Sequence, residues 1–313
     1  MSDRWRAVLR AAAVLVFAVA VTAGLVTALR GQDWSVAARI LTPGSVGLVA
    51  AAFAVNSVAM VFSWLSWRVL LVDLGGPVDT VTSARIFFVG FLAKFAPGRV
   101  WTLLANIRMG ASAGVGAARM AAVYALTVVI STLTGLALGT VAGLAVLGRT
   151  ALVLALAAVP VVVCLARPDL VNRGAGRLAR LLRRPPPVMS ASGRGVRWSI
   201  VAQTVCWVVA GVQLWLLAVA QGAPPLRTLP ISIGAFALGT VAGVAVVLLP
   251  DGLGVREGVL LVALATVLPL PAAGVVTVAS RLLCTLSEIA VAGVAVLVSE
   301  VVKRRQPHYA NAR

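Results

Sequence analysis

Long apolar runs are the feature of this sequence that most restricts its fold. A helix needs about 20 apolar residues to cross the hydrocarbon core of a bilayer. Six runs reach or approach that length: residues 7–29, 46–71, 117–147, 150–166, 198–220 and 272–302. The chain is 61% hydrophobic and only 12% charged, whereas soluble domains are about 45–50% apolar and about 25% charged. We therefore predict an all-α polytopic membrane protein with six full transmembrane helices.

Two further apolar segments are interrupted near their centres by charged residues, prolines and glycines. These are residues 86–107 and residues 231–270, and each half is too short for an ordinary crossing. Such halves are typical of re-entrant or discontinuous helices. We predict two broken helical hairpins, about eight membrane segments in all, although either hairpin could be a pair of full spans. An inverted repeat is one arrangement that this pattern allows.

The net charge of +18 would suggest a nucleic-acid partner in a soluble protein. Here the position of the charge favours another reading, because residues 167–197 hold eight arginines and one acid. Basic loops of this kind remain in the cytoplasm. We expect a single membrane domain with halves 7–166 and 198–302, joined by the cytoplasmic linker 167–197. We exclude nucleic acid as a partner.

The same rule places the N-terminus, which we expect to be uncleaved, and the tail, residues 303–313, in the cytoplasm of a multi-pass protein. The membrane that we expect is a bacterial-type plasma membrane. With this parity the first hairpin opens toward the cytoplasm and the second opens toward the outside. That opposition is what an inverted repeat would produce.

The first interrupted segment carries a cationic break, with Lys94, Pro97, Gly98 and Arg99 in the order Lys-Phe-Ala-Pro-Gly-Arg-Val-Trp. Proline interrupts a helix because it lacks an N–H donor and clashes with the preceding turn. A broken helix end exposes unpaired N–H groups, and two cations lie beside it. This combination predicts an anion-binding site.

The second break runs Pro-Asp-Gly-Leu-Gly-Val-Arg-Glu-Gly from Pro250 and includes Gly252, Gly254, Arg256 and Glu257. Arg281 and Glu288 lie seven residues apart on one face of the last apolar run. Charged residues at bilayer depth cost about 2.5–3.5 kcal/mol each on insertion scales. They therefore indicate either a polar cavity for an anionic headgroup or buried pairs that fix helix register. The pairings we consider are Arg256 with Glu288 and Glu257 with Arg281.

At these two breaks the chain resembles the lysylphosphatidylglycerol synthase transmembrane (flippase-like) family, which includes the membrane half of the bacterial multiple peptide resistance factor. The resemblance spans nearly the whole chain. It departs from the usual pattern at Trp101-Thr102, where many members have Gly-Glu, and at Asp251, where a small residue is usual. The resemblance implies a lipid flippase-like role. The family's aminoacyl transfer belongs to a separate soluble domain, so it does not imply lysyl transfer here.

We therefore expect a transporter that moves an anionic, phosphate-containing lipid between leaflets. Glu257 and Glu288 would balance charge or carry a coupling proton. The headgroup would be bound by the residues of the two breaks: Lys94, Pro97, Gly98, Arg99, Gly252, Gly254, Arg256 and Arg281. The partner would be a phospholipid or a polyprenyl-phosphate-linked substrate.

Two other functions remain open at this point: a membrane partner of a cell-envelope enzyme, and a lipid-carrier glycosyl- or phosphotransferase. An enzyme is disfavoured because the acids outside the breaks are scattered and His308 is the only histidine. Single cysteines at 164, 206 and 284 show no metal-ligand spacing. We predict no catalytic residues, no metal and no cofactor.

Overall fold

The computed structural model describes most of the two membrane halves. The first predicted crossing (residues 7–29), most of 150–166, most of the linker and the tail lie outside the described residues, as do Pro97, Gly98 and Arg99. The described residues are 42–76, 78–95, 100–147, 159–167, 173, 191–245 and 250–305.

Every regular element in the described part of the chain is a helix, and five of the helices are long and apolar enough to cross a membrane. These are α3 (Pro43–Asp73), α6 (Ala117–Leu147), α10 (Gly193–Ala220), α11 (Pro225–Ala245) and α13 (Leu270–Arg305). Four of the six predicted crossings are confirmed by α3, α6, α10 and α13. A short helix, α8 (Val159–Ala166), covers the end of the run at 150–166.

Helix α10 begins at Gly193, so the last five residues that the sequence assigns to the linker belong to the helix. The cause is a cap. The Ser192 hydroxyl accepts a hydrogen bond from the Gly195 N–H, which satisfies a free donor of the first turn. Asp73, at the end of α3, accepts hydrogen bonds from both the backbone N–H and the hydroxyl of Ser192. The cap therefore also ties the two membrane halves together at this end.

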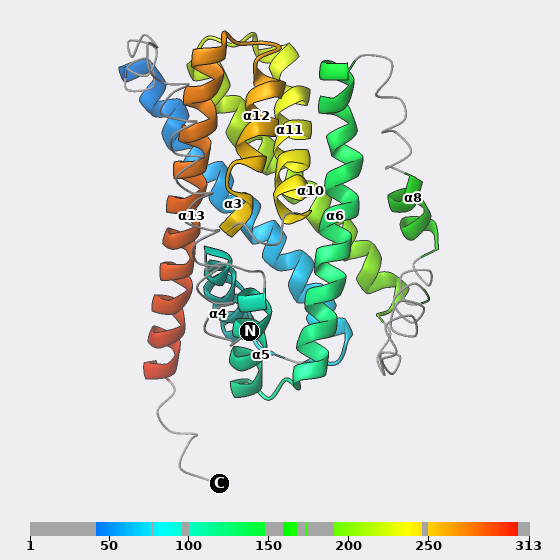
Figure 1. The fold of residues 1–313 in the computed structure, drawn as a ribbon. Coiled ribbons are helices and arrows are strands. Elements are labelled where there is room, and N and C mark those ends of the chain that lie inside the picture. The colour runs from blue at the N-terminus through cyan, green and yellow to red at the C-terminus, as the bar shows by residue number, and fades with distance from the viewer. Residues whose placement is uncertain are drawn as a thin grey trace, which may run out of the picture.

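Both interrupted segments are helical hairpins with a short 3-10 turn at or beside the break. The first consists of α4 (Thr80–Leu92), η2 (Ala93–Phe95) and α5 (Val100–Ser112). The second consists of α11, η5 (Pro250–Gly252) and α12 (Val255–Leu264). The hairpins enter from opposite ends of the bundle, and their turns pack together near mid-height (Figure 1).

The first arm of the second hairpin is longer than the sequence predicts. Its first arm begins at Pro225 rather than residue 231 and reaches a length sufficient to cross a membrane. Proline suits a first helical turn, where its missing N–H has no partner to lose, so the helix can begin at Pro225. Pro230 is accommodated inside the helix one turn later.

The packing core lies along the crossing of α3 and α10, which run against each other over much of their length (Figure 1). Buried Trp67, Leu70 and Leu71 of α3 and Leu214 and Leu217 of α10 are almost inaccessible. Helix α6 packs against α11 through small residues. A side-chain carbon at Gly139 would lie 2.9 Å from Leu238, so glycine permits this close approach. The Gly-Thr-Val-Ala-Gly string at 139–143 thus contributes to helix packing.

Candidate headgroup-binding cavity between two opposed hairpins

Lys94 joins the two breaks directly. It projects from η2, at the turn of the first hairpin, and its Nζ lies 2.7 Å from Oε1 of Glu288 on α13. The same Nζ lies 3.2 Å from Oδ1 of Asp251, at the turn of the second hairpin. The Lys94 ammonium also lies 4.3 Å from the ring centre of Phe91, where a cation is attracted by the aromatic face. Residues far apart in the sequence therefore form one largely buried ion-pair cluster.

Arg281 extends this cluster from the middle of α13. Its Nη1 lies 2.6 Å from Oε1 of Glu257, which is one of the two pairings considered from sequence. Its Nη2 lies 3.7 Å from Oδ2 of Asp251. Glu257 also accepts a hydrogen bond from the backbone N–H of Gly254 at 2.7 Å, so it caps the first turn of α12 while it pairs with Arg281.

Asp251 is a member of the cluster that the sequence analysis did not include among the site residues. Its carboxylate contacts both Lys94 and Arg281. The sequence held a signal for it, because Asp251 is an acid inside an otherwise apolar segment. Its backbone has φ of 48°, an uncommon value for a residue with a side chain, on a turn where Gly252 and Gly254 also have positive φ.

Arg256 has a different environment from the other cations. It is 5% exposed, and within the described part of the chain no carboxylate oxygen lies within salt-bridge distance of its guanidinium. The expected pairing with Glu288 is absent, because Glu288 pairs with Lys94 instead. Nη2 of Arg256 donates a hydrogen bond to Sγ of Cys284 at 3.4 Å, and the guanidinium carbon lies 4.7 Å from the ring centre of Phe236.

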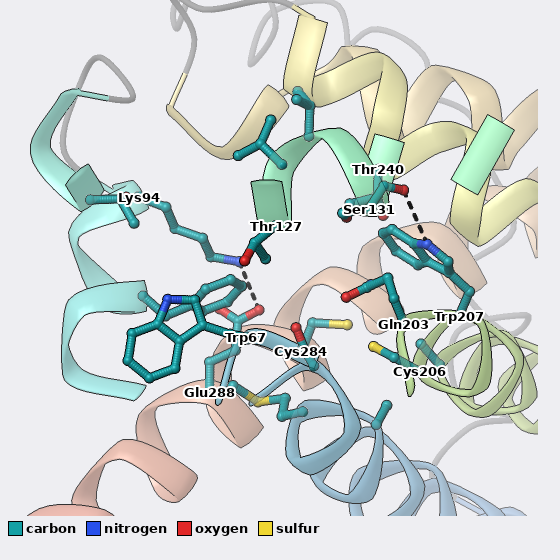
Figure 2. Close-up of a pocket in the computed structure, with 18 of the residues that line it drawn as sticks. Trp67, Lys94, Thr127, Ser131, Gln203, Cys206, Trp207, Thr240, Cys284 and Glu288 are labelled. Atoms are coloured by element: carbon teal, nitrogen blue, oxygen red, sulfur yellow. Dashed lines mark hydrogen bonds and ion pairs between the residues drawn. The ribbon is translucent and has the colours of Figure 1, made fainter. Parts of the chain in front are cut away.

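A cavity of about 230 Å³ lies beside these residues. Lys94, Asp251, Arg256 and Glu288 all line it, so it borders both breaks. Figure 2 shows Lys94 reaching Glu288 at one side of the cavity, with hydroxyl, amide, tryptophan and cysteine side chains around the remainder. The sequence analysis did not select Asn106 or Gln203, which also line the cavity. Asn106 is the one amide of α5, and Gln203 is one of two in α10. The cost of inserting a polar side chain in an apolar helix was a usable signal for both.

The remaining predicted site residues have other positions. Gly252 and Gly254 shape the turn. A side-chain carbon on Gly252 would overlap Gly243 of α11, so this glycine allows turn and helix to approach closely. Pro97, Gly98 and Arg99 lie outside the described residues. The structure therefore brings together Lys94, Arg281, Glu257 and Glu288 and places Arg256 on the cavity wall.

A bundle of apolar helices with a charged cavity between two opposed hairpins defines a polytopic membrane protein with a buried polar site. Residues 10–292 match the family described as "Lysylphosphatidylglycerol synthase TM region". Because this match covers most of the 313 residues, the chain belongs to that family, which points to a function connected with membrane lipids. Among curated proteins, none is significantly similar to this chain.

Proposed function

We propose that this protein binds the anionic headgroup of a phosphate-containing lipid in the cavity and moves that lipid between the leaflets. The observation that carries the proposal is the buried guanidinium of Arg256. It lines the cavity and has no carboxylate partner in the described part of the chain. A buried charge that forms no direct ion pair is costly. A lipid phosphate would supply that counter-charge, and a planar guanidinium binds phosphate with two parallel hydrogen bonds.

The opposed hairpins support translocation rather than binding alone. One hairpin enters from each end of the bundle, and their turns meet (Figure 1). Lys94 and Asp251 of these turns line the cavity. Discontinuous helices that meet near the midplane are a recurrent design of transporters, in which the site opens to one side and then to the other. In this scheme the headgroup occupies the cavity while the acyl chains remain in the surrounding lipid.

The proposal is tested by replacing Arg256 with Gln and measuring the translocation of phosphatidylglycerol, labelled on an acyl chain, in proteoliposomes. We expect the rate to fall at least about tenfold, because a hydrogen bond to a charged group contributes about 1.5–3 kcal/mol. Arg256→Lys should keep only part of the activity, since lysine retains the charge without the planar fork. Arg304→Gln is the matched control, because Arg304 is an exposed arginine near the end of α13.

Melting temperature in detergent separates a binding defect from a folding defect in these variants. An Arg256→Gln protein that melts like the wild type and still translocates the lipid at the wild-type rate would refute the proposal.

A further inference from the structure

We infer that each anionic lipid crosses this protein together with one proton, which Glu288 binds when the lipid phosphate binds Arg256. The inference rests on the proposed function and adds to it a coupling ion. It follows from the balance of charges around the cavity, from the hydrogen bonds of the acids among them, and from the place of Glu288 on the cavity wall.

The charges around the cavity are equal in number before any lipid enters. Within the described part of the chain, three cations and three acids form this group: Lys94, Arg256, Arg281, Asp251, Glu257 and Glu288. The ion pairs join only two of the cations, Lys94 and Arg281, to all three acids, so the paired residues carry one negative charge in excess. Arg256, which lines the cavity beside them, offsets that charge.

A bound lipid disturbs this balance. A phosphodiester carries one negative charge, and once it pairs with Arg256 the group again has one negative charge in excess. An uncompensated charge at bilayer depth is costly. One proton bound by an acid of the group restores neutrality, so we expect proton and lipid to bind together.

The hydrogen bonds and ion pairs of the three acids distinguish which of them is free to take the proton. Glu257 uses both oxygens, because Oε1 lies 2.6 Å from Nη1 of Arg281 and Oε2 accepts from the Gly254 N–H at 2.7 Å. Asp251 also uses both, with Oδ1 3.2 Å from Nζ of Lys94 and Oδ2 3.7 Å from Nη2 of Arg281. A proton on either residue would disrupt an existing contact.

Glu288 has one oxygen to spare. Its Oε1 pairs with Lys94 at 2.7 Å, whereas its Oε2 is buried and has no hydrogen-bond partner within the described residues. The residue is 7% exposed and lines the cavity. Buried acceptors are nearly always paired, and an unpaired one costs free energy. A proton on Oε2 makes this oxygen a donor, which can hydrogen-bond to a phosphate oxygen in the cavity while Oε1 keeps its contact with Lys94.

The other titratable groups around Glu288 cannot replace it as the proton acceptor. At neutral pH the side chains of lysine, arginine, cysteine and tyrosine already hold their protons, so only carboxylates can accept one. The parts of α3, α4, α5 and α11 that line the cavity are apolar or neutral. The charged and titratable groups of the other described elements around it are Lys94 on η2, Asp251 on η5, Arg256 and Glu257 on α12, Arg281 and Cys284 on α13, Cys206 on α10 and Tyr124 on α6.

Coupled binding predicts how the lipid affinity depends on pH. In the pH range in which Glu288 is ionised in the empty protein and protonated in the complex, the affinity falls by up to about tenfold for each unit by which the pH rises. The empty and the loaded site are both neutral. The pH difference across the membrane, and not the electrical potential, therefore drives lipid and proton together toward the more alkaline side.

The first test measures proton uptake on binding. Dihexanoyl phosphatidylglycerol is added to the detergent-solubilised protein in weak buffer, and the pH is followed with an indicator dye against protein-free detergent. We expect the wild-type protein to take up about one proton per bound lipid, and Glu288→Gln to take up none. Glu300→Gln is the matched control, because Glu300 lies on the same helix with its side chain 48% exposed, and it should behave like the wild type.

The second test measures the distribution of acyl-labelled phosphatidylglycerol between the leaflets of proteoliposomes under a pH difference of about one unit. The wild-type protein should enrich the lipid in the leaflet on the alkaline side, toward a limit of about tenfold per pH unit. Glu288→Gln should abolish this enrichment. Glu257→Gln should preserve it even where the rate falls, because both oxygens of Glu257 are already engaged.

The outcomes separate this inference from the proposed function. A wild-type protein that moves the lipid without enrichment and without proton uptake would overturn proton coupling and leave translocation intact. Loss of the enrichment in Glu257→Gln but not in Glu288→Gln would overturn the assignment of the proton to Glu288. Tighter binding of dihexanoyl phosphatidylethanolamine, without proton uptake, would make Glu288 the partner of an amine instead. No movement of any lipid by well-folded protein would overturn the proposed function itself.

Discussion

At the scale of single residues, glycines in one motif have opposite structural roles. Gly252 has φ of 63°, and a side-chain carbon there would overlap the backbone of Gly243. Gly258 lies in helix α12, and a side-chain carbon there would meet nothing within 4 Å. The first glycine is required by backbone conformation and by space, whereas the second occupies an exposed helical position that alanine would suit better.

This contrast gives a paired prediction. Gly252→Ala should destabilise the protein by about 1–3 kcal/mol, because alanine is strained at positive φ and would push the turn away from α11. Gly258→Ala should be neutral or stabilising by up to about 1 kcal/mol. The two effects are compared by unfolding in SDS titrations of the purified protein. Equal destabilisation by both substitutions would contradict the assigned roles.

At the scale of elements, ion pairs hold the turns of the two hairpins together. Lys94 on η2 contacts Asp251 on η5 and Glu288 on α13, and the lysine and glutamate side chains are 17% and 9% exposed. A second lysine–glutamate pair, Lys303 with Glu300, lies 3.5 Å apart on one helix face with side chains 63% and 48% exposed. Removing one partner of a buried pair leaves an uncompensated charge, whereas exposed pairs contribute little.

A double-mutant cycle with Lys94→Met and Glu288→Gln is expected to show a coupling energy of about 1–3 kcal/mol. The double variant should be more stable than the sum of the two single effects would suggest, because each single variant leaves one charge of this pair without the other. The same cycle on Lys303 and Glu300 should give less than about 0.5 kcal/mol. If the two cycles gave the same coupling, the buried cluster would have no special part in holding the hairpins.

At the scale of the whole molecule, most of the basic residues in the described helices gather at one end of the bundle. The helix ends at that end are those of α3, α5 and α13 and the beginnings of α4, α6 and α10 (Figure 1). They carry Arg68, Arg85, Arg108, Arg119, Arg194, Arg197, Lys303 and Arg304, whereas Arg227 lies at the opposite end, near the start of α11. Because basic residues favour the cytoplasmic side, we expect the first hairpin to open toward the cytoplasm.

Labelling of intact cells tests this orientation. In a Cys164→Ala background, Arg227→Cys should react with a membrane-impermeant maleimide from outside, and Arg304→Cys should react only after the membrane is permeabilised. Cys206 and Cys284 are buried and serve as the background signal. The reverse pattern would invert the sidedness of both hairpins.

The sequence predicts the parts of this fold that hydropathy and helix breakers determine. It identifies four crossings and both hairpin breaks, because apolar runs and prolines act locally. It predicts two pairings, and the structure contains one of them, Glu257 with Arg281. The other, Glu288 with Arg256, is wrong because Glu288 pairs with Lys94. That partner depends on how closely the first hairpin approaches α13, which no local pattern encodes. Asp251 is visible in the sequence as an acid in an apolar segment, but its contacts with Lys94 and Arg281 depend on the same approach.

The link between the hairpins has a consequence for genetics. Lys94 and Glu288 are in contact although they stand 194 positions apart in the chain. A damaging change in one half should therefore be compensated most readily by a second change in the other half. A selection for revertants of a Lys94 variant should yield suppressors at Asp251 or Glu288 more often than among the neighbours of Lys94 in the sequence. Substitutions in the two halves would then be correlated at contacting positions, as they are between interacting subunits.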